Sequence, residues 1–214
     1  MFTEIACYSQ DSTFEDLMRT IFISSQSGAK FVALPSGFLN RVQDFIEHQE
    51  FSAVIDFPYG ISTTQVRLHE IILSIRSGAK AIDLVLHSGY LKEGNWKKVS
   101  EDLKACNAVC KENEVSLRPI IEYRLFEPKT ILTACEILEK NGIYTLINST
   151  GSIIDDPNDN AIMCHSIQKN TSLSVISCSN RITDKYYKIF EDIGIEAFRF
   201  TSPIIAENIL SSGV

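Results

Sequence analysis

The sequence predicts an α/β fold, a single (β/α)8 barrel of the TIM type over residues 1–214. Short apolar runs alternate eight times with longer segments of helical periodicity. The runs are apolar on both faces, which is what parallel strands covered by helices require. Eight such units within 214 residues fit a minimal closed barrel better than an open doubly wound sheet, and no linker divides the chain.

The predicted strands are the apolar runs, of which AVIDF, AIDLVL and SVIS are typical. They lack the alternation of polar and apolar residues that marks a strand with one face in water. In chain order they are Glu4–Tyr8, Lys30–Leu34, Ser52–Phe57, Lys80–Leu86, Ser116–Glu122, Tyr144–Asn148, Leu173–Cys178 and Glu196–Thr201.

The segments between the strands carry helix start and stop signals. The first helix has candidate N-caps at residues 11–13, and a later one has Pro128 near its start. Glycines such as Gly78 and Gly142 stand at helix ends shortly before a strand, as C-terminal caps do. The helix over residues 62–78 presents one apolar stripe, formed by Val66, Ile71, Ile72 and Ile75.

Charge and composition argue against several classes of function. The formal net charge is −7 and the basic residues are scattered, which disfavours a nucleic-acid partner. No apolar run is long enough to span a membrane, and the first residues do not resemble a secretory signal, so we expect a cytoplasmic protein without a membrane partner. The six cysteines form no CxxC pair and no set with histidine, so we expect reduced thiols, no metal and no cofactor.

Several segments carry a resemblance to a known family. They are SAVIDFPYG, EIILSIRSGAKAIDLVLHSGYLKEG, LRPIIEY, LINSTG, SVISCSNRIT and FRFTSP. In order and spacing they resemble the deoxyribose-phosphate aldolases over nearly the whole chain. The resemblance implies the same barrel fold.

The resemblance also implies which positions would carry aldolase chemistry. In that family a lysine on the sixth strand forms an imine with the substrate carbonyl, and a second lysine on the seventh strand lowers the pKa of the first. Here these positions hold Ile147 and Ile176, and only the acid of the fourth strand remains, as Asp83. Because the imine requires an amine, we expect no Schiff-base aldolase activity.

The segments that hold the substrate phosphate in the family are altered as well. The glycine of the STG turn is kept as Gly151, but the paired glycines are Ser179 and Asn180 here. The turn of Ser149, Thr150 and Gly151 can present backbone N–H groups to an anion, or it can be kept because a tight turn needs small residues. Both interpretations stay open, and these five residues are the candidate ligand-binding positions.

The resemblance implies that Asp83 on the fourth strand points into the barrel, and that Arg118 on the fifth sits where the family has a lysine, so a group of polar residues is expected inside the barrel. Side chains alternate along a strand, so Asp83 shares a face with His87, and Arg118 shares one with Glu122. In one interpretation Arg118 neutralises the buried Asp83, and we expect the two within salt-bridge distance. In the other, Asp83 with His87, joined by Glu122, performs acid–base chemistry at the carboxyl ends of the strands.

These observations predict a divergent member of the aldolase family without Schiff-base activity, either a pseudoenzyme or a protein that binds a small molecule such as a phosphosugar. The alternative is a lyase-like enzyme that acts on a small phosphosugar or polar carbonyl compound through Asp83, His87 and Glu122. The expected partner is a small molecule, and assembly as a homodimer is left open.

Overall fold

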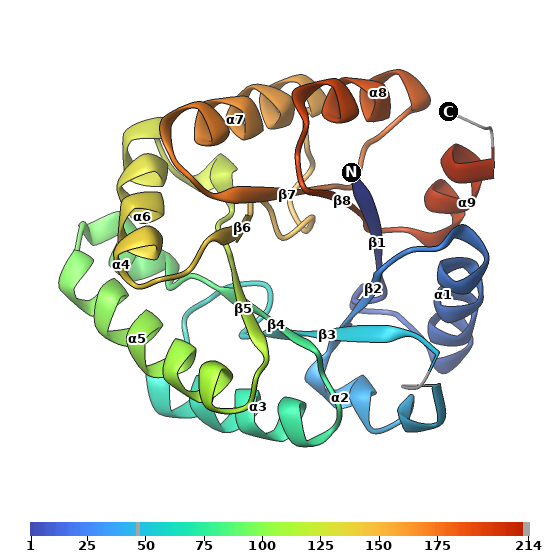
Figure 1. The fold of residues 1–214 in the computed structure, drawn as a ribbon, viewed down its shortest axis with the longest axis horizontal. Helices are drawn as coiled ribbons and strands as arrows, with labels where there is room; N and C mark the ends of the chain where they lie inside the picture. Colours follow the sequence, from blue (N-terminus) through green and yellow to red (C-terminus); the bar gives the residue numbers. More distant parts are fainter. Residues whose placement is uncertain (46–47, 212–214) are drawn as a thin grey trace.

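A closed barrel of eight parallel strands forms the centre of the protein, in a computed structural model that describes residues 1–45 and 48–211 (Figure 1). Neighbouring strands follow chain order, and β8 closes the barrel by pairing with β1. The strands are β1 (Phe2–Ala6), β2 (Phe31–Pro35), β3 (Glu50–Ile55), β4 (Ala81–Val85), β5 (Ser116–Ile120), β6 (Thr145–Ile147), β7 (Ser174–Ser179) and β8 (Ala197–Phe200). The predicted (β/α)8 barrel is therefore confirmed.

Each predicted strand overlaps an observed one, and the ends differ by one or two residues in most cases. Two of these differences affect the candidate site. Strand β4 ends at Val85 and β5 ends at Ile120, so His87 and Glu122 lie in the connections beyond the strands. Their side chains are therefore placed by loop geometry rather than by strand alternation.

The helices form a ring around the barrel (Figure 1). The candidate N-cap range is confirmed, because Thr13 caps α1 and its side chain accepts a hydrogen bond from the Asp16 N–H. The short helices α2 and α4 and the two 3-10 turns were not predicted. The helices are α1 (Phe14–Ser27), α2 (Ser36–Leu39), α3 (Thr64–Arg76), α4 (Ser88–Glu93), α5 (Trp96–Glu112), α6 (Pro128–Lys140), α7 (Pro157–Asn170), α8 (Asp184–Ile193) and α9 (Pro203–Ser211), and the 3-10 turns are Gln43–Phe45 and Tyr123–Leu125.

The predicted apolar stripe of α3 is wrong at one position. Val66 is 56% exposed, and the neighbouring Arg67 is fully buried in its place. The guanidinium of Arg67 pairs with Asp56 at 2.7 Å and with Asp102 at 2.5 Å, and it also donates to the carbonyl oxygen of Val85 at 2.9 Å. These bonds compensate the desolvation of Arg67, so the helix turns a charged residue toward the barrel.

The interior of the barrel is separate from the layer between strands and helices. Its apolar part consists of Ala6, Ala33, Val54, Val85, Ile120, Ile147, Ile176, Cys178 and Ala197. Strand pairing places Ile147 beside Ile120 on one side and beside Ile176 on the other. Ile147 and Ile176, at the positions that resemble the family's lysines, therefore face the interior, and both are at most 1% exposed.

Two predictions from composition can be compared with the structure. All six cysteines are buried free thiols. Among the helices of residues 1–45 and 48–211, none is both long and apolar enough to cross a bilayer.

Candidate functional site

Four charged side chains meet in the barrel interior, and we call them the interior charge cluster: Glu4, Asp83, Arg118 and Arg199. Arg118 Nε donates to Asp83 Oδ1 at 2.7 Å, and an Arg118 terminal nitrogen donates to Glu4 at 2.6 Å. Arg199 bridges the same two acids, with bonds of 2.6 Å to Asp83 and 2.8 Å to Glu4. The hydroxyl of Ser52 completes the set by donating to Asp83 at 2.8 Å.

The interior charge cluster is neutral in sum and almost fully buried. Glu4 and Asp83 are 0% exposed, Arg199 is 1% and Arg118 is 4% exposed. Burial alone would raise the pKa of Asp83, but the charges of Arg118 and Arg199 outweigh it and hold that pKa below its ordinary value. The predicted ion pair of Asp83 and Arg118 is therefore confirmed.

Sequence reasoning missed Glu4 and Arg199. The signal was present, because each is a charged residue inside an otherwise apolar strand, in FTEIA and AFRF. A buried charge in such a run implies a partner of opposite sign. The partners could not be read from the chain, since Glu4 and Arg199 meet only when β8 closes against β1.

A pocket of about 1030 Å³ opens at the carboxyl ends of the strands. This is the end of such barrels where ligands bind. The lining comes mostly from the connections after the strands. It comprises Tyr8, Ser9, Gln10, Ser12, Pro35, Phe38, Val54, Phe57, Pro58, Tyr59, Ile61, Glu70, Ser88, Glu122, Leu125, Thr150, Gly151, Ser152, Ile153 and Thr201.

The predicted acid–base residues fall into three separate networks. Asp83 is held in the interior charge cluster, and neither it nor His87 lines the pocket. His87 caps α4, where its Nδ1 accepts the Tyr90 N–H at 3.3 Å and its ring stacks on that of Tyr90. Burial and the charge of Arg67 lower the pKa of His87. Of the three proposed acid–base groups, Glu122 is the one that reaches the pocket.

Glu122 is held by neutral donors. Its Oε2 accepts the Thr150 N–H at 2.9 Å, the Thr150 hydroxyl at 2.6 Å and the Ser149 hydroxyl at 3.2 Å. Its Oε1 accepts one long bond, from Ser149 at 3.4 Å. The side chain is 6% exposed, and burial raises the pKa of Glu122 although hydrogen bonds from Thr150, from Ser149 and from the backbone N–H of Arg124 act in the opposite direction.

The turn after β6 uses its backbone N–H groups within the protein. The N–H of Thr150 goes to Glu122, that of Gly151 to the Ser149 hydroxyl at 3.0 Å, and that of Ser152 to the Thr150 hydroxyl at 3.1 Å. An anion cup requires such groups to be free for the ligand. The geometry therefore favours the interpretation in which Ser149, Thr150 and Gly151 are kept for the turn.

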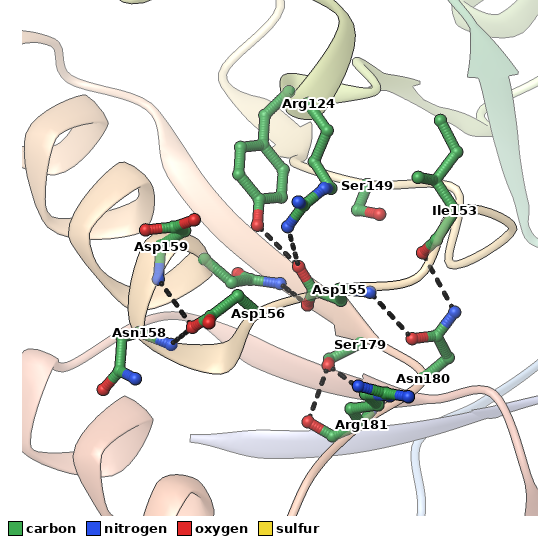
Figure 2. A network of polar contacts seen from close by, with 12 residues as sticks. Arg124, Ser149, Ile153, Asp155, Asp156, Asn158, Asp159, Ser179, Asn180 and Arg181 are labelled. Carbon is green, nitrogen blue, oxygen red and sulfur yellow. Dashed lines mark hydrogen bonds and ion pairs between the residues drawn. The ribbon is translucent and has the colours of Figure 1, made fainter.

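The next candidate residues, Ser179 and Asn180, fix the loop that follows this turn. The Asn180 amide donates to the carbonyl oxygens of Gly151 and Ile153 and accepts the Asp155 N–H. Figure 2 shows Asn180 beside Asp155, which lies at the centre of the network. The Ser179 hydroxyl donates to the carbonyl oxygen of Arg181 and accepts its N–H, both at 3.1 Å. The polar groups of Ser179 and Asn180 thus form hydrogen bonds with the backbone of neighbouring loop residues.

Tyr8, a lining residue of the pocket, places its hydroxyl beside Gly151. Its hydroxyl donates to the Thr150 carbonyl oxygen at 3.0 Å and lies 3.3 Å from Cys178 Sγ. A Cβ at Gly151 would lie 2.5 Å from Thr201 Cγ2 and 3.0 Å from Cys178 Sγ. The space directly around the Gly151 Cα is therefore filled by the side chains of Thr201 and Cys178.

Replacing Gly151 with alanine is expected to lower the free energy of unfolding by about 2–4 kcal/mol, the sum of a left-handed backbone penalty and an overpacked contact. The matched control is Gly194→Ala. Gly194 has a similar φ of +76° against +73° at Gly151, but nothing lies within 4 Å of its Cβ position. Urea unfolding measures the loss of unfolding free energy in each variant, and the difference between the two losses is the contribution of the close contacts at Gly151. Equal losses in the two variants would contradict the close packing at Gly151.

Comparison with known families agrees with this architecture. The model for the DeoC/LacD family aldolases matches residues 5–168, which ends before β7. A deoxyribose-phosphate aldolase of Treponema denticola is 37% identical over 99 residues, 46% of each chain. That of Mycoplasmopsis pulmonis is 30% identical over 139 residues, which are 64% of this chain and 62% of the relative. The matched stretches thus span less than two thirds of these curated relatives.

Solved structures extend the likeness in fold to nearly the whole chain. A tetrameric deoxyribose phosphate aldolase from Aeropyrum pernix superposes with a TM-score of 0.88 at 17% identity, over 99% of this chain and 90% of that one. An aldolase called QR15 gives 0.84 at 19% identity, over 99% and 94%. The solved structures show the fold, and the family match over residues 5–168 shows that the chain belongs to the DeoC/LacD family of aldolases.

Proposed function

We propose that the protein is a small-molecule-binding member of the aldolase family that lacks Schiff-base activity. The observation that carries the proposal is the location of the lysines. Every lysine of the chain lies on a helix or a connection and is solvent-exposed. None lines the pocket, and the interior positions that resemble the family's lysines are the buried Ile147 and Ile176. An imine intermediate requires an amine in contact with the substrate carbonyl.

The pocket itself supports binding. Its volume of about 1030 Å³ lies in the upper range of small-molecule sites, and it combines aromatic and aliphatic side chains with a few polar groups. The lining contains no Lys, Arg or His among the residues that the structure describes. Since phosphate sites commonly use such cations or free N–H groups, this lining does not favour a phosphosugar ligand.

Incubation with 2-deoxyribose 5-phosphate and borohydride, followed by intact-mass measurement, tests the proposal. The expected result is an unmodified mass, because no lysine reaches the pocket. An active family member treated in parallel should gain one reduced adduct. Stoichiometric labelling of a single lysine in this chain, located by peptide mapping, would overturn the proposal. Diffuse labelling of several exposed lysines is slow glycation and would appear equally with an unrelated aldehyde.

A second candidate is acid–base catalysis by Glu122 alone. Its support is a buried carboxyl with a raised pKa at the edge of a pocket, an arrangement that recurs at catalytic sites. The original three-residue form of this alternative loses support, because Asp83 and His87 are engaged elsewhere. Product analysis of the same incubation separates the candidates. Cleavage of the sugar phosphate without any adduct would favour Glu122 catalysis.

A further inference from the structure

Glu122 differs from the other buried carboxylates among the residues that the structure describes. Four others have an arginine as ion-pair partner: Glu4 and Asp83 with Arg118 and Arg199, Asp102 with Arg67, and Asp155 with Arg124. Glu122, at 6% exposure, has no ion pair among the described residues. A buried carboxylate without a cation is costly, so this position requires an explanation.

Glu122 borders the pocket, and one of its two carboxylate oxygens is only lightly bonded. Its Oε2 is occupied by three donors, whereas Oε1 has one hydrogen bond of 3.4 Å. Oε1 therefore has unused capacity to accept a charge-assisted hydrogen bond. Glu122 is also a lining residue of the pocket, so a ligand there has access to it.

The rest of the lining suits an organic cation. Glu70 adds a second carboxylate, which is held by the Ser36 hydroxyl at 2.8 Å and the Asp56 N–H at 3.1 Å. The rings of Tyr8 and Phe57 pack on each other at 4.5 Å and give the lining an aromatic wall, of the kind that attracts a cation or an apolar group. Exposed apolar side chains continue to the rim, where Tyr59 is 66% and Ile61 is 63% exposed.

We propose that this pocket binds a protonated primary amine with an apolar body, and that the ammonium group pairs with Glu122. The ligand then supplies the cation that the protein provides to its other buried carboxylates. The apolar body lies along the aromatic and aliphatic lining. This inference rests on the proposed function, because it names the ligand class of the same pocket.

A charge series on the native protein tests the inference directly. Hexylamine, 1-hexanol and hexanoate share one chain and differ in the head group, and isothermal titration calorimetry measures each at neutral pH. We expect hexylamine to bind at least about tenfold more tightly than hexanol, a ratio typical of one charge-assisted hydrogen bond. Hexanoate and 2-deoxyribose 5-phosphate should not bind. Equal binding of hexylamine and hexanol, preference for either anion, or no binding of hexylamine at millimolar concentration would each overturn it.

Variants locate the effect. Glu122→Gln should weaken hexylamine about tenfold and leave hexanol unchanged, since the amide still accepts the Thr150 N–H. The matched control is Glu127→Gln, an exposed glutamate after the same strand that does not line the pocket and makes no side-chain cap bond. If Glu122→Gln does not fold, Glu70→Gln tests the other carboxylate and should also weaken hexylamine selectively. Unchanged hexylamine affinity in the folded variant contradicts the pairing.

The two proposals fail in different ways. A lysine adduct in the borohydride experiment contradicts the proposed function, whether or not hexylamine binds. If hexylamine does not bind and the borohydride experiment leaves the protein mass unchanged, only the proposed ligand class is wrong. The proposal of a binding protein without imine chemistry then still stands.

Discussion

Replacing Arg118 with alanine is expected to lower the free energy of unfolding by about 3–5 kcal/mol, the range for removing one partner of a buried ion pair. Arg118 donates to Asp83 at 2.7 and 3.1 Å and to Glu4 at 2.6 Å, and both acids are 0% exposed. The variant leaves two buried carboxylates with Arg199 as their remaining cation. The cluster then carries a net negative charge without access to water.

The measurement is urea unfolding followed by circular dichroism, with Arg19→Ala as the control. Arg19 pairs with Glu207 at 3.7 Å, and both side chains are 52% exposed, so its loss should cost no more than about 1 kcal/mol. A loss at Arg118 as small as the control would mean that Arg199 compensates both acids alone. Arg118→Met separates the loss of charge from the loss of volume.

The pH dependence of this variant follows from the pKa of Asp83. In the native protein the two arginines hold that pKa below its ordinary value, so the stability that Asp83 contributes is present above the pKa of the unfolded chain and is lost as pH falls through the folded value. Without Arg118 the folded pKa of Asp83 rises. The stability difference between the two proteins should therefore narrow in the acid range, where the stranded carboxyl takes up a proton.

The barrel could be predicted because each of its signals is local. Apolar runs, helix caps and the alternation of side chains all operate within about ten residues. The resemblance to the aldolases then placed Asp83 and Arg118 inside the barrel. The register of β4 and β5 then sets Asp83 directly opposite Arg118. Pairing between neighbouring strands thus made this ion pair predictable from strand positions.

The rest of the site depends on contacts that the local pattern does not encode. Glu4 and Arg199 are brought together by closure of the barrel, 195 positions apart in sequence. Arg67, and not the predicted Val66, lies on the buried face of α3, because two aspartates from other segments compensate its charge. Tyr8 is fixed at the wall of the pocket by bonds to residues more than 140 positions away. Such partners follow from tertiary packing.

The second large effect is expected from the double variant Ile147→Lys, Ile176→Lys, which restores the lysines at the positions that resemble the family's. The two side chains lie on paired positions of β6 and β7 and are at most 1% exposed. Arg199 lies nearby on β8, in register with Cys178 of β7, two residues after Ile176. Two ammonium groups placed there would repel each other and lose hydration, so both lysine pKa values should fall. We therefore expect a clear loss of stability, measured by thermal unfolding. The variant with methionine at both positions, which keeps the volume without charge, should lose much less.

The same variant should not become an efficient aldolase. The N–H groups of Thr150, Gly151 and Ser152 are bonded within the protein, and Pro203, which follows β8, has no N–H to offer. A substrate phosphate would therefore be held poorly, and a misplaced carbonyl costs at least about a hundredfold in rate. The expected result in a coupled retro-aldol assay is turnover at least about a hundredfold below that of an active family member, even where borohydride traps an adduct on a new lysine. Turnover comparable to that enzyme would show that the turn can release its N–H groups to the substrate. In that case the loss of two amines alone would separate this protein from the catalytic members of its family.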